Sequence, residues 1–175
     1  MVGITSTYWK WCVGNVRFYC LLNQHFRLIV SCSLEEDLMG FAEYDQYDAL
    51  GLSELVKKGE ISARDLLDEA IRRRDAINPQ INAIIFNMDE LAYRAIEDGL
   101  PDGPFHGVPF LLKDLLAAYK GVPLSNGCRA YKDFIPDYDS EMVVRFKNAG
   151  LVIFGKTNSP ENGYVGCTEP LLHGV

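Results

Sequence analysis

A lysine directly followed by an aspartate, Lys113-Asp114, ends an apolar run that begins at Gly107. Val, Phe and Leu in a short block bounded by Gly and Pro predict a buried β-strand. A lysine at the end of such a strand needs a partner or a task, because burying an ammonium group is costly. Burial also favours the neutral amine, which can accept a proton. Two interpretations stay open: Lys113 is a catalytic base, or it extends its amine to solvent and pairs with Asp114.

A second lysine, Lys156, lies in a segment that matches the phosphate-loop pattern G-x-x-x-x-G-K-[ST] over residues 150–157. That loop requires a strand before its first glycine and a helix that starts at the lysine. Here a helix is expected before Gly150, and the four variable positions are Leu, Val, Ile and Phe, which predict a strand. Pro160 follows closely. We therefore reject nucleotide binding at residues 150–157.

The other polar side chains offer weaker candidates for a site. A possible thiol–imidazole set comprises His106, Cys128, Cys167 and His173. Two possible carboxylate pairs are Glu161 with Glu169 and Asp133 with Asp137. A catalytic pair must meet in space and be oriented by a third group, which the sequence does not indicate. Solvated loop charges explain the carboxylates, and no metal-ligand spacing is present. We expect no metal and no cofactor.

Helices and strands alternate from Asp45 onward, which predicts an α/β layered fold. Helices are expected over residues 50–58, 62–78, 87–98 and 140–149, and strands over 81–86, 107–114 and 151–154. Gly59 is expected to end the first helix and Ser62, with Asp65, to begin the second.

Three further details of these elements are predicted from local signals. Asn78-Pro79 should stop the second helix, so that Arg72 to Arg74 lie at its solvated C-terminal end. Asn87 and Glu90 should form a capping box for the third helix. Residues 121–139 form a long loop region, and loops of this length are usually functional.

Composition narrows the class of protein. The chain has 175 residues, of which 48% are hydrophobic, and a net charge of -7, which argues against a partner held through nucleic-acid phosphates. No apolar run reaches the length of a membrane span. Five cysteines at irregular spacings are typical of free thiols in a reducing compartment, so we expect a cytoplasmic protein.

Residues 1–38 differ from the rest. They are neutral overall, and they hold both tryptophans and three of the five cysteines. They lack the uninterrupted apolar centre of a secretory signal. We treat residues 1–38 as an atypical, unassigned leader and residues 39–175 as the N-terminal portion of one domain, with Met39 as a candidate natural start.

Several sequence blocks occur in the order found in one known family. After Gly107-Val108-Pro109 and Lys113-Asp114 come Gly121-Val122-Pro123, Ser125-Asn126-Gly127, Asp139-Ser140, Gly155-Lys156-Thr157-Asn158 and Thr168-Glu169-Pro170. With these blocks the chain resembles the amidase signature family, and within it the sequence is similar to bacterial amidases that open linear or cyclic amides.

The resemblance implies a mixed sheet covered by helices and hydrolysis of carboxamide C–N bonds by a Ser–Ser–Lys mechanism without a cofactor. Lys113 matches the position of the base. Both serines belong to a glycine-rich segment that follows later in the family, and neither Ser125, Ser140 nor Ser159 has such a setting. We therefore expect an incomplete fold, a more exposed Lys113, and no hydrolysis by residues 1–175 alone. The alternative is a non-catalytic relative that binds or complements another chain. The amide substrate and the oligomeric state stay open.

Overall fold

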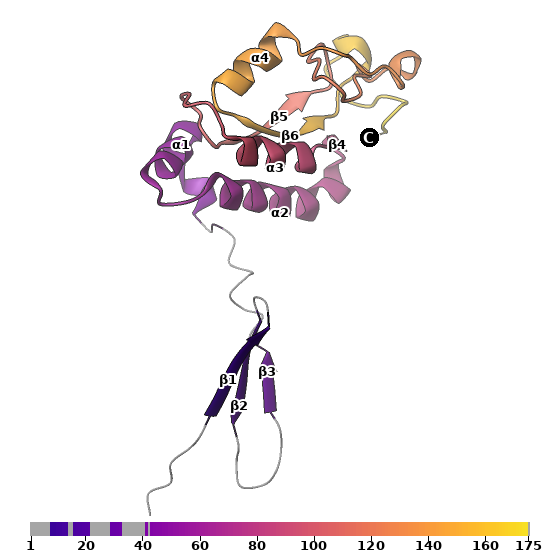
Figure 1. The fold of residues 1–175 in the computed structure, drawn as a ribbon. Helices are drawn as coiled ribbons and strands as arrows, with labels where there is room; N and C mark the ends of the chain where they lie inside the picture. Colours follow the sequence, from indigo (N-terminus) through magenta and orange to yellow (C-terminus); the bar gives the residue numbers. More distant parts are fainter. Residues whose placement is uncertain (1–7, 14–15, 22–28, 33–40, 42, 175) are drawn as a thin grey trace, which may run out of the picture. The chain divides into compact units, whose positions relative to one another are not determined.

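The computed structural model describes residues 8–13, 16–21, 29–32, 41 and 43–174, and its contacts divide the chain into residues 1–39 and 40–175 (Figure 1). In the first unit, strands β1 (Tyr8–Val13), β2 (Val16–Leu21) and β3 (Ile29–Cys32) form an antiparallel sheet in the order β1-β2-β3. The predictions about the start at Met39 and the thiols of residues 1–38 concern residues or side chains outside this description.

The second unit is built on a mixed sheet of three described strands. These are β4 (Ile84–Asn87), β5 (Pro109–Lys113) and β6 (Val152–Thr157), in the order β4-β6-β5. Strand β6 is central, antiparallel to β4 and parallel to β5. The predicted strand 151–154 therefore continues through Lys156 to Thr157. The α/β class is confirmed.

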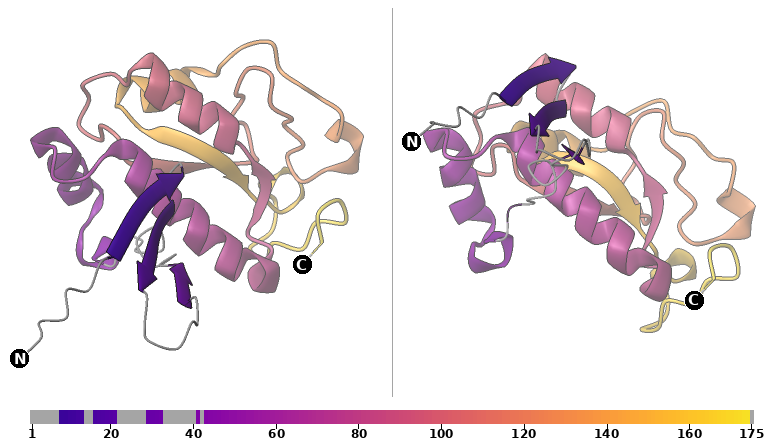
Figure 2. Two further views of the ribbon diagram at one scale, coloured as in Figure 1. Left: turned by 60° about the horizontal axis from the view of Figure 1, so that its bottom comes forward. Right: turned by 90° about the horizontal axis from the view of Figure 1, so that it is seen from below.

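Helices cover both faces of this sheet. They are α1 (Ala49–Lys58), α2 (Ala63–Ile81), α3 (Asp89–Asp98) and α4 (Glu141–Asn148). Helices α2 and α3 lie on one side and α4 on the other (Figures 1 and 2). Single 3₁₀ turns occur at Tyr44–Gln46 (η1), Arg129–Tyr131 (η2) and Glu161–Gly163 (η3). Within the described residues, no helix has the length and apolar character needed to cross a membrane.

Alternation along the strands divides the core between the two faces. Leu112 and Ile153 pack with Val143 of α4, whereas Phe154 packs with Leu67 of α2 and Ala92 of α3. Successive side chains of a strand point to opposite faces, so each strand supplies both core layers. This alternation also decides which polar groups at the strand ends are buried.

The predicted boundaries around α1 and α2 are confirmed. Gly59 ends α1 in the left-handed conformation, with φ of 71° and its N–H bonded to the carbonyls of the last turn. Ser62 begins α2, its hydroxyl accepts the N–H of Asp65, and the Asp65 side chain accepts the N–H of Ser62. These local signals need no tertiary context.

The predicted stop at Asn78-Pro79 is wrong, because α2 continues to Ile81 with Pro79 inside it. The Asn78 side chain bonds both the N–H and the carbonyl of Ile84, at 2.7 and 2.8 Å, and so fastens the last turn to β4. Asn82, with φ of 43°, closes the helix by donating its N–H to the Asn78 carbonyl. Tertiary contacts thus override the unfavourable residue before proline.

The arginine run does not lie at a solvated helix end. Arg72 and Arg73 both bond the fully buried carboxylate of Glu69 within α2, and Arg74 pairs with Asp89 of α3. Hydrogen bonds from Arg72 and then Arg73 hold the pKa of Glu69 below its usual value, against the effect of burial. Through Arg74 the run therefore connects α2 to α3.

The predicted capping box of α3 is also wrong. Asn87 is the last residue of β4 and pairs with Gly155, so the residue before the helix is Met88, which makes no side-chain cap. Glu90 extends into solvent, with 91% of its side chain exposed, toward Arg94. Asn87 therefore cannot cap α3, because it is part of strand β4.

Candidate functional site

The C-terminal ends of the parallel strands β5 and β6 lie side by side and carry the candidate site. Lys113, the last residue of β5, is in register with Thr157, the last residue of β6. The Lys113 side chain is exposed. Asp114, one residue later, is fully buried on the opposite face.

The partner of Asp114 is Lys156, not Lys113. Lys156 Nζ lies 2.7 Å from Asp114 Oδ1 and donates to the carbonyl of Pro123 at 2.6 Å, and neither charged side chain is exposed. The interpretation that Lys113 pairs with Asp114 is therefore wrong. Successive side chains of a strand alternate, so Lys113 and Asp114 point to opposite faces. The parallel register places Lys156 beside Leu112, which points to the same face as Asp114.

Ser125, which is fully buried, and His173, which is partly buried, complete this polar group. The Ser125 N–H lies 3.2 Å from both carboxylate oxygens of Asp114, and its hydroxyl donates to Asp114 Oδ2. The same hydroxyl oxygen accepts the N–H of Gly127 at 3.2 Å and lies 3.0 Å from His173 Nε2. Ser125 and Lys156 thus meet at the Asp114 carboxylate, and His173 joins them through the Ser125 hydroxyl.

Burial governs the protonation of two groups in this cluster. It lowers the pKa of Lys156, while the hydrogen bond and charge of Asp114 oppose that shift. It also lowers the pKa of His173 below its ordinary value of 6.5, again opposed by Asp114. Both shifts follow from the cost of charge in a poorly solvated site.

The loops around the strand ends have an unusual backbone. Leu116, Asn126 and Gly127 all have positive φ, of 61°, 51° and 66°. Asn126 accepts the N–H of Leu116 on its side chain, at 3.0 Å, and the N–H of Asn162 on its carbonyl, at 2.8 Å. Residues that accept such conformations are held by their surroundings, and they cluster at functional sites.

These residues fall inside a recognised family. The sequence matches the amidase family over residues 65–175. The chain belongs to this family. Over 130 residues it is 43% identical to the 6-aminohexanoate-cyclic-dimer hydrolase of Paenarthrobacter ureafaciens, which covers 73% of this chain and 26% of that protein. It is 38% identical to an acylamidase of Rhodococcus erythropolis, over 68% of this chain and 26% of the relative.

Solved amidase structures agree with this assignment. A 6-aminohexanoate cyclic dimer hydrolase superposes with a TM-score of 0.69 at 41% identity, over 74% of this chain and 27% of that one. Fatty acid amide hydrolase, at 18% identity and a TM-score of 0.69, shares the fold. The chain spans about a quarter of the length of these relatives.

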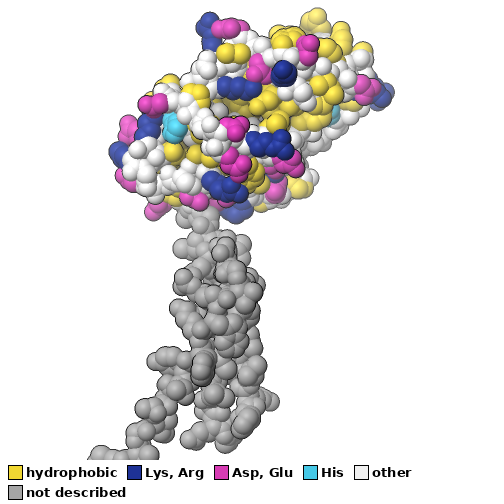
Figure 3. All heavy atoms as spheres, in the orientation of Figure 1, with side chains coloured by type: hydrophobic (Ala, Val, Ile, Leu, Met, Phe, Trp, Pro, Cys, Tyr) yellow, Lys and Arg dark blue, Asp and Glu magenta, His cyan; other side chains and the backbone are white. Residues whose placement is uncertain are grey.

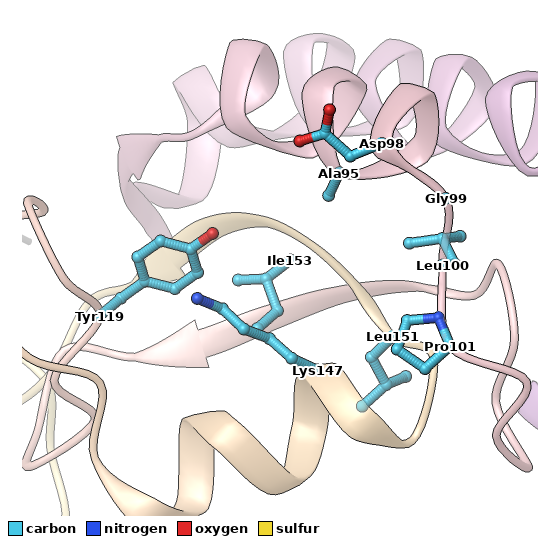
Figure 4. A pocket seen from close by; sticks show the side chains of 9 residues that line it. All are labelled: Ala95, Asp98, Gly99, Leu100, Pro101, Tyr119, Lys147, Leu151 and Ile153. Atoms are coloured by element: carbon cyan, nitrogen blue, oxygen red, sulfur yellow. The ribbon is translucent and has the colours of Figure 1, made fainter.

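Two hollows on this amidase unit lie apart from Lys113. One, of about 240 Å³, is walled by apolar groups such as Leu100 and Ile153, and Lys147 points into it (Figure 4). Lys147 Nζ sits 3.7 Å from the centre of the Tyr119 ring and is ion-paired with Asp139, so its charge is already satisfied. The other, of about 340 Å³, lies between α2 and the sheet.

The remaining candidates from the sequence do not converge. His106 Nδ1 lies 2.9 Å from the Pro101 carbonyl, Cys128 is a buried free thiol and Cys167 an exposed one. Across the described residues, no group of three or more His, Cys, Asp or Glu gathers as a metal site would require.

The segment that resembles a phosphate loop is strand β6 instead of a loop. Lys156 is buried against a carboxylate, so its amine is not presented to a phosphate.

Sequence reasoning missed the buried group of Asp114, Lys156, Ser125 and His173. One signal was available: a lysine inside an apolar strand needs an anionic partner, and Asp114 directly follows another apolar strand. The role of His173 had no such signal, because it depends on how a loop folds back.

Proposed function

We propose that Lys113 is the proton-accepting base of an amide-hydrolysing site, in which the serine nucleophile and its serine partner come from outside residues 1–175. The observation that carries this proposal is the position of Lys113 in an amidase-family chain. The Lys113 side chain is exposed where the parallel strands β5 and β6 end. The neighbouring Asp114 carboxylate points to the other face and is paired with Lys156. Such edges are where α/β proteins place their sites.

Two serines near the strand ends, Ser125 and Ser159, are unsuited to the nucleophile's part. Ser125 is fully buried, and its hydroxyl proton is donated to Asp114. Ser159 is equally buried and donates to the carbonyl of Pro160. A nucleophile must reach the substrate and transfer its proton to a base, which neither hydroxyl can do in this setting.

In the proposed reaction, the amine of Lys113 takes the proton of the nucleophilic serine through the second serine as the hydroxyl attacks the amide carbonyl. The proton then passes to the departing nitrogen, and water releases the acid. The substrate would be a small-molecule amide, as the names of the relatives suggest, with no cofactor. A cytoplasmic location fits the thiol content of the sequence.

The test joins residues 1–175 to the part of the Paenarthrobacter ureafaciens hydrolase that follows its matching segment. We expect this chimera to hydrolyse 6-aminohexanoate cyclic dimer or a simple carboxamide, and residues 1–175 alone to be inactive. Lys113→Ala should lower the rate at least about 100-fold, the usual contribution of a positioned base. Lys120→Ala, at an exposed lysine nearby, is the matched control. An active Lys113→Ala chimera would refute the role of Lys113, and activity of residues 1–175 alone would refute the need for outside serines.

Exposed apolar side chains favour a second candidate, a chain that binds and complements another polypeptide. They lie on the loops that follow β5 and β6, and Figure 3 shows hydrophobic atoms over one face of this unit. The exposed side chains are Leu116, Tyr131, Phe134, Ile135, Tyr138, Tyr164, Val165 and Leu171. Contiguous exposed apolar surface usually marks an interaction site.

This candidate predicts that the separate remainder of the hydrolase, mixed with residues 1–175, forms a stable complex on size-exclusion chromatography. A Leu171→Lys variant should weaken that complex. A chain that remains a monodisperse monomer, with a sharp cooperative melt and no complex, would contradict this second candidate.

A further inference from the structure

The Asp114 carboxylate is held by donors from two other segments of the chain. Lys156 Nζ of β6 lies 2.7 Å from Asp114 Oδ1. The Ser125 N–H lies 3.2 Å from both carboxylate oxygens, and the Ser125 hydroxyl donates to Oδ2. The Asp114 N–H in turn donates to the Thr157 carbonyl at 3.1 Å. Both the side chain and the backbone of residue 114 are therefore fixed in place.

Lys113 depends on this anchorage for its own position. Within the described part of the chain, the Lys113 amine makes no ion pair or hydrogen bond. Its placement is therefore set by the backbone from which the side chain extends. Lys113 and Asp114 share a peptide bond, and their side chains point to opposite faces of the strand. Fixing the Asp114 carboxylate on one face therefore fixes the point from which the Lys113 side chain leaves the other face.

The same carboxylate also holds the loops that border the strand ends. Ser125 begins a turn in which the next residue, Asn126, has a φ of 51°. Asn126 accepts the Leu116 N–H on its side chain at 3.0 Å and the Asn162 N–H on its carbonyl at 2.8 Å. Leu116 follows β5, and Asn162 follows β6. The turn that Asp114 anchors thus links both loops at this edge of the sheet.

We propose that Asp114 is a positioning residue for Lys113, because its hydrogen bonds with Ser125 hold the end of β5 in one arrangement. This inference rests on the proposed role of Lys113 in amide hydrolysis. Lys156 keeps the buried carboxylate ionised, so both of its oxygens accept hydrogen bonds. Hydrogen bonds are directional and apolar contacts are not, so an apolar pair would fill the same space without specifying the arrangement. A displacement of about 1 Å in a reacting group can lower a rate about 100-fold.

Two double variants separate this positioning from support of the fold. The first, Asp114→Asn with Lys156→Met, removes both charges and keeps a side-chain oxygen that accepts from Ser125. The second, Asp114→Leu with Lys156→Met, removes the charges and the acceptor but keeps apolar atoms in the space. Replacing a buried ion pair by apolar residues of similar volume is often neutral for stability. We call them the acceptor-keeping and the acceptor-free variant, and urea denaturation establishes the conditions in which each is folded.

The first readout is amide hydrogen exchange in the chain of 175 residues. Protection of the Asp114 and Leu116 N–H groups, taken relative to α2, should be at least about tenfold lower in the acceptor-free variant than in the acceptor-keeping one. A loss of global stability would lower the protection of α2 as well, so the ratio reports the strand end alone. Equal ratios in the two variants would overturn the proposal.

The second readout is hydrolysis by the chimera with the Paenarthrobacter ureafaciens hydrolase. The acceptor-free changes should lower kcat at least about tenfold relative to the acceptor-keeping changes, with KM altered less than about threefold. A misplaced base slows the chemical step and leaves substrate binding intact. Equal kcat values in two chimeras that both require Lys113 would contradict the positioning role. If Lys113→Ala leaves the parent chimera active, the proposed function fails, and the exchange ratio still decides whether Asp114 fixes the strand end.

Discussion

Two lysines at the ends of adjacent parallel strands have opposite environments. Lys113 ends β5 and is exposed, whereas Lys156, next to last in β6, is fully buried with Asp114 as its partner. Adjacency in sequence would have paired Lys113 with Asp114. The comparison teaches that the face of the strand, not the spacing along the chain, decides which lysine is structural and which is available for chemistry.

The largest expected effect comes from breaking the buried pair. Asp114→Asn leaves the Lys156 ammonium unpaired in the core, which should lower the free energy of unfolding by about 3–5 kcal/mol. Lys113→Met, at the exposed lysine, should change it by no more than about 0.5 kcal/mol. Urea denaturation followed by circular dichroism measures both.

A double variant sharpens this prediction. Asp114→Asn combined with Lys156→Met should destabilise less than the sum of the single changes, with a coupling of about 0.5–3 kcal/mol. Equal losses for Lys113→Met and Lys156→Met would show that the two lysines do not differ as the structure indicates.

The loop beside the buried pair should be nearly as sensitive. A Cβ at Gly127 would lie 2.3 Å from the Ser159 carbonyl oxygen, and φ there is 66°. Gly127→Ala should therefore cost about 2–4 kcal/mol, from backbone strain and overpacking together. Gly59 is the matched control, because its φ is 71° but nothing lies within 4 Å of an added Cβ.

Gly59→Ala should cost only about 1–2 kcal/mol, since strain alone acts there. The difference between the two midpoints in thermal melts tests the close approach of residues 127 and 159. Equal costs would mean that the two loops separate easily.

The sequence predicted the elements of the second unit better than their ends and partners. Gly59 and the Ser62–Asp65 pair are local signals, so they were identified correctly. Pro79 was misread because the bonds between Asn78 and Ile84, which keep the last turn helical, join segments that only the fold brings together. The Asp114 cluster was missed for the same reason, since its members span residues 114–173.

Ser125 should matter less than the ion pair that it supports. Ser125→Ala removes the hydroxyl that bonds Asp114 and meets His173, and leaves the backbone N–H contacts and Lys156 in place. The expected loss is about 1–3 kcal/mol, the cost of leaving buried polar groups without a partner. Urea denaturation measures the loss, and an unchanged free energy of unfolding would show that the Asp114–Lys156 pair does not need the hydroxyl.

The smallest expected effect lies at Asp139 and at Lys147 of helix α4. Burial acts to raise the pKa of Asp139, but the N–H of Lys120 and the Lys147 ammonium outweigh it and hold the pKa below 3.8. The stability from this carboxylate is therefore present above pH 3.8 and is lost as the pH falls through the lower, folded-state value. Lys147→Met should cost about 0.5–1 kcal/mol at pH 7, because the pair is partly exposed, and should reduce the loss of stability between pH 4 and pH 2. Denaturation midpoints at these pH values measure the effect, with Arg145→Met, at an exposed pair on the same helix, as the control. If Lys147→Met leaves the acid profile unchanged, the lowered pKa of Asp139 comes from the Lys120 N–H alone. The partly exposed Lys147 would then contribute less to stability than the structure implies, and the difference from the buried Lys156 would be larger.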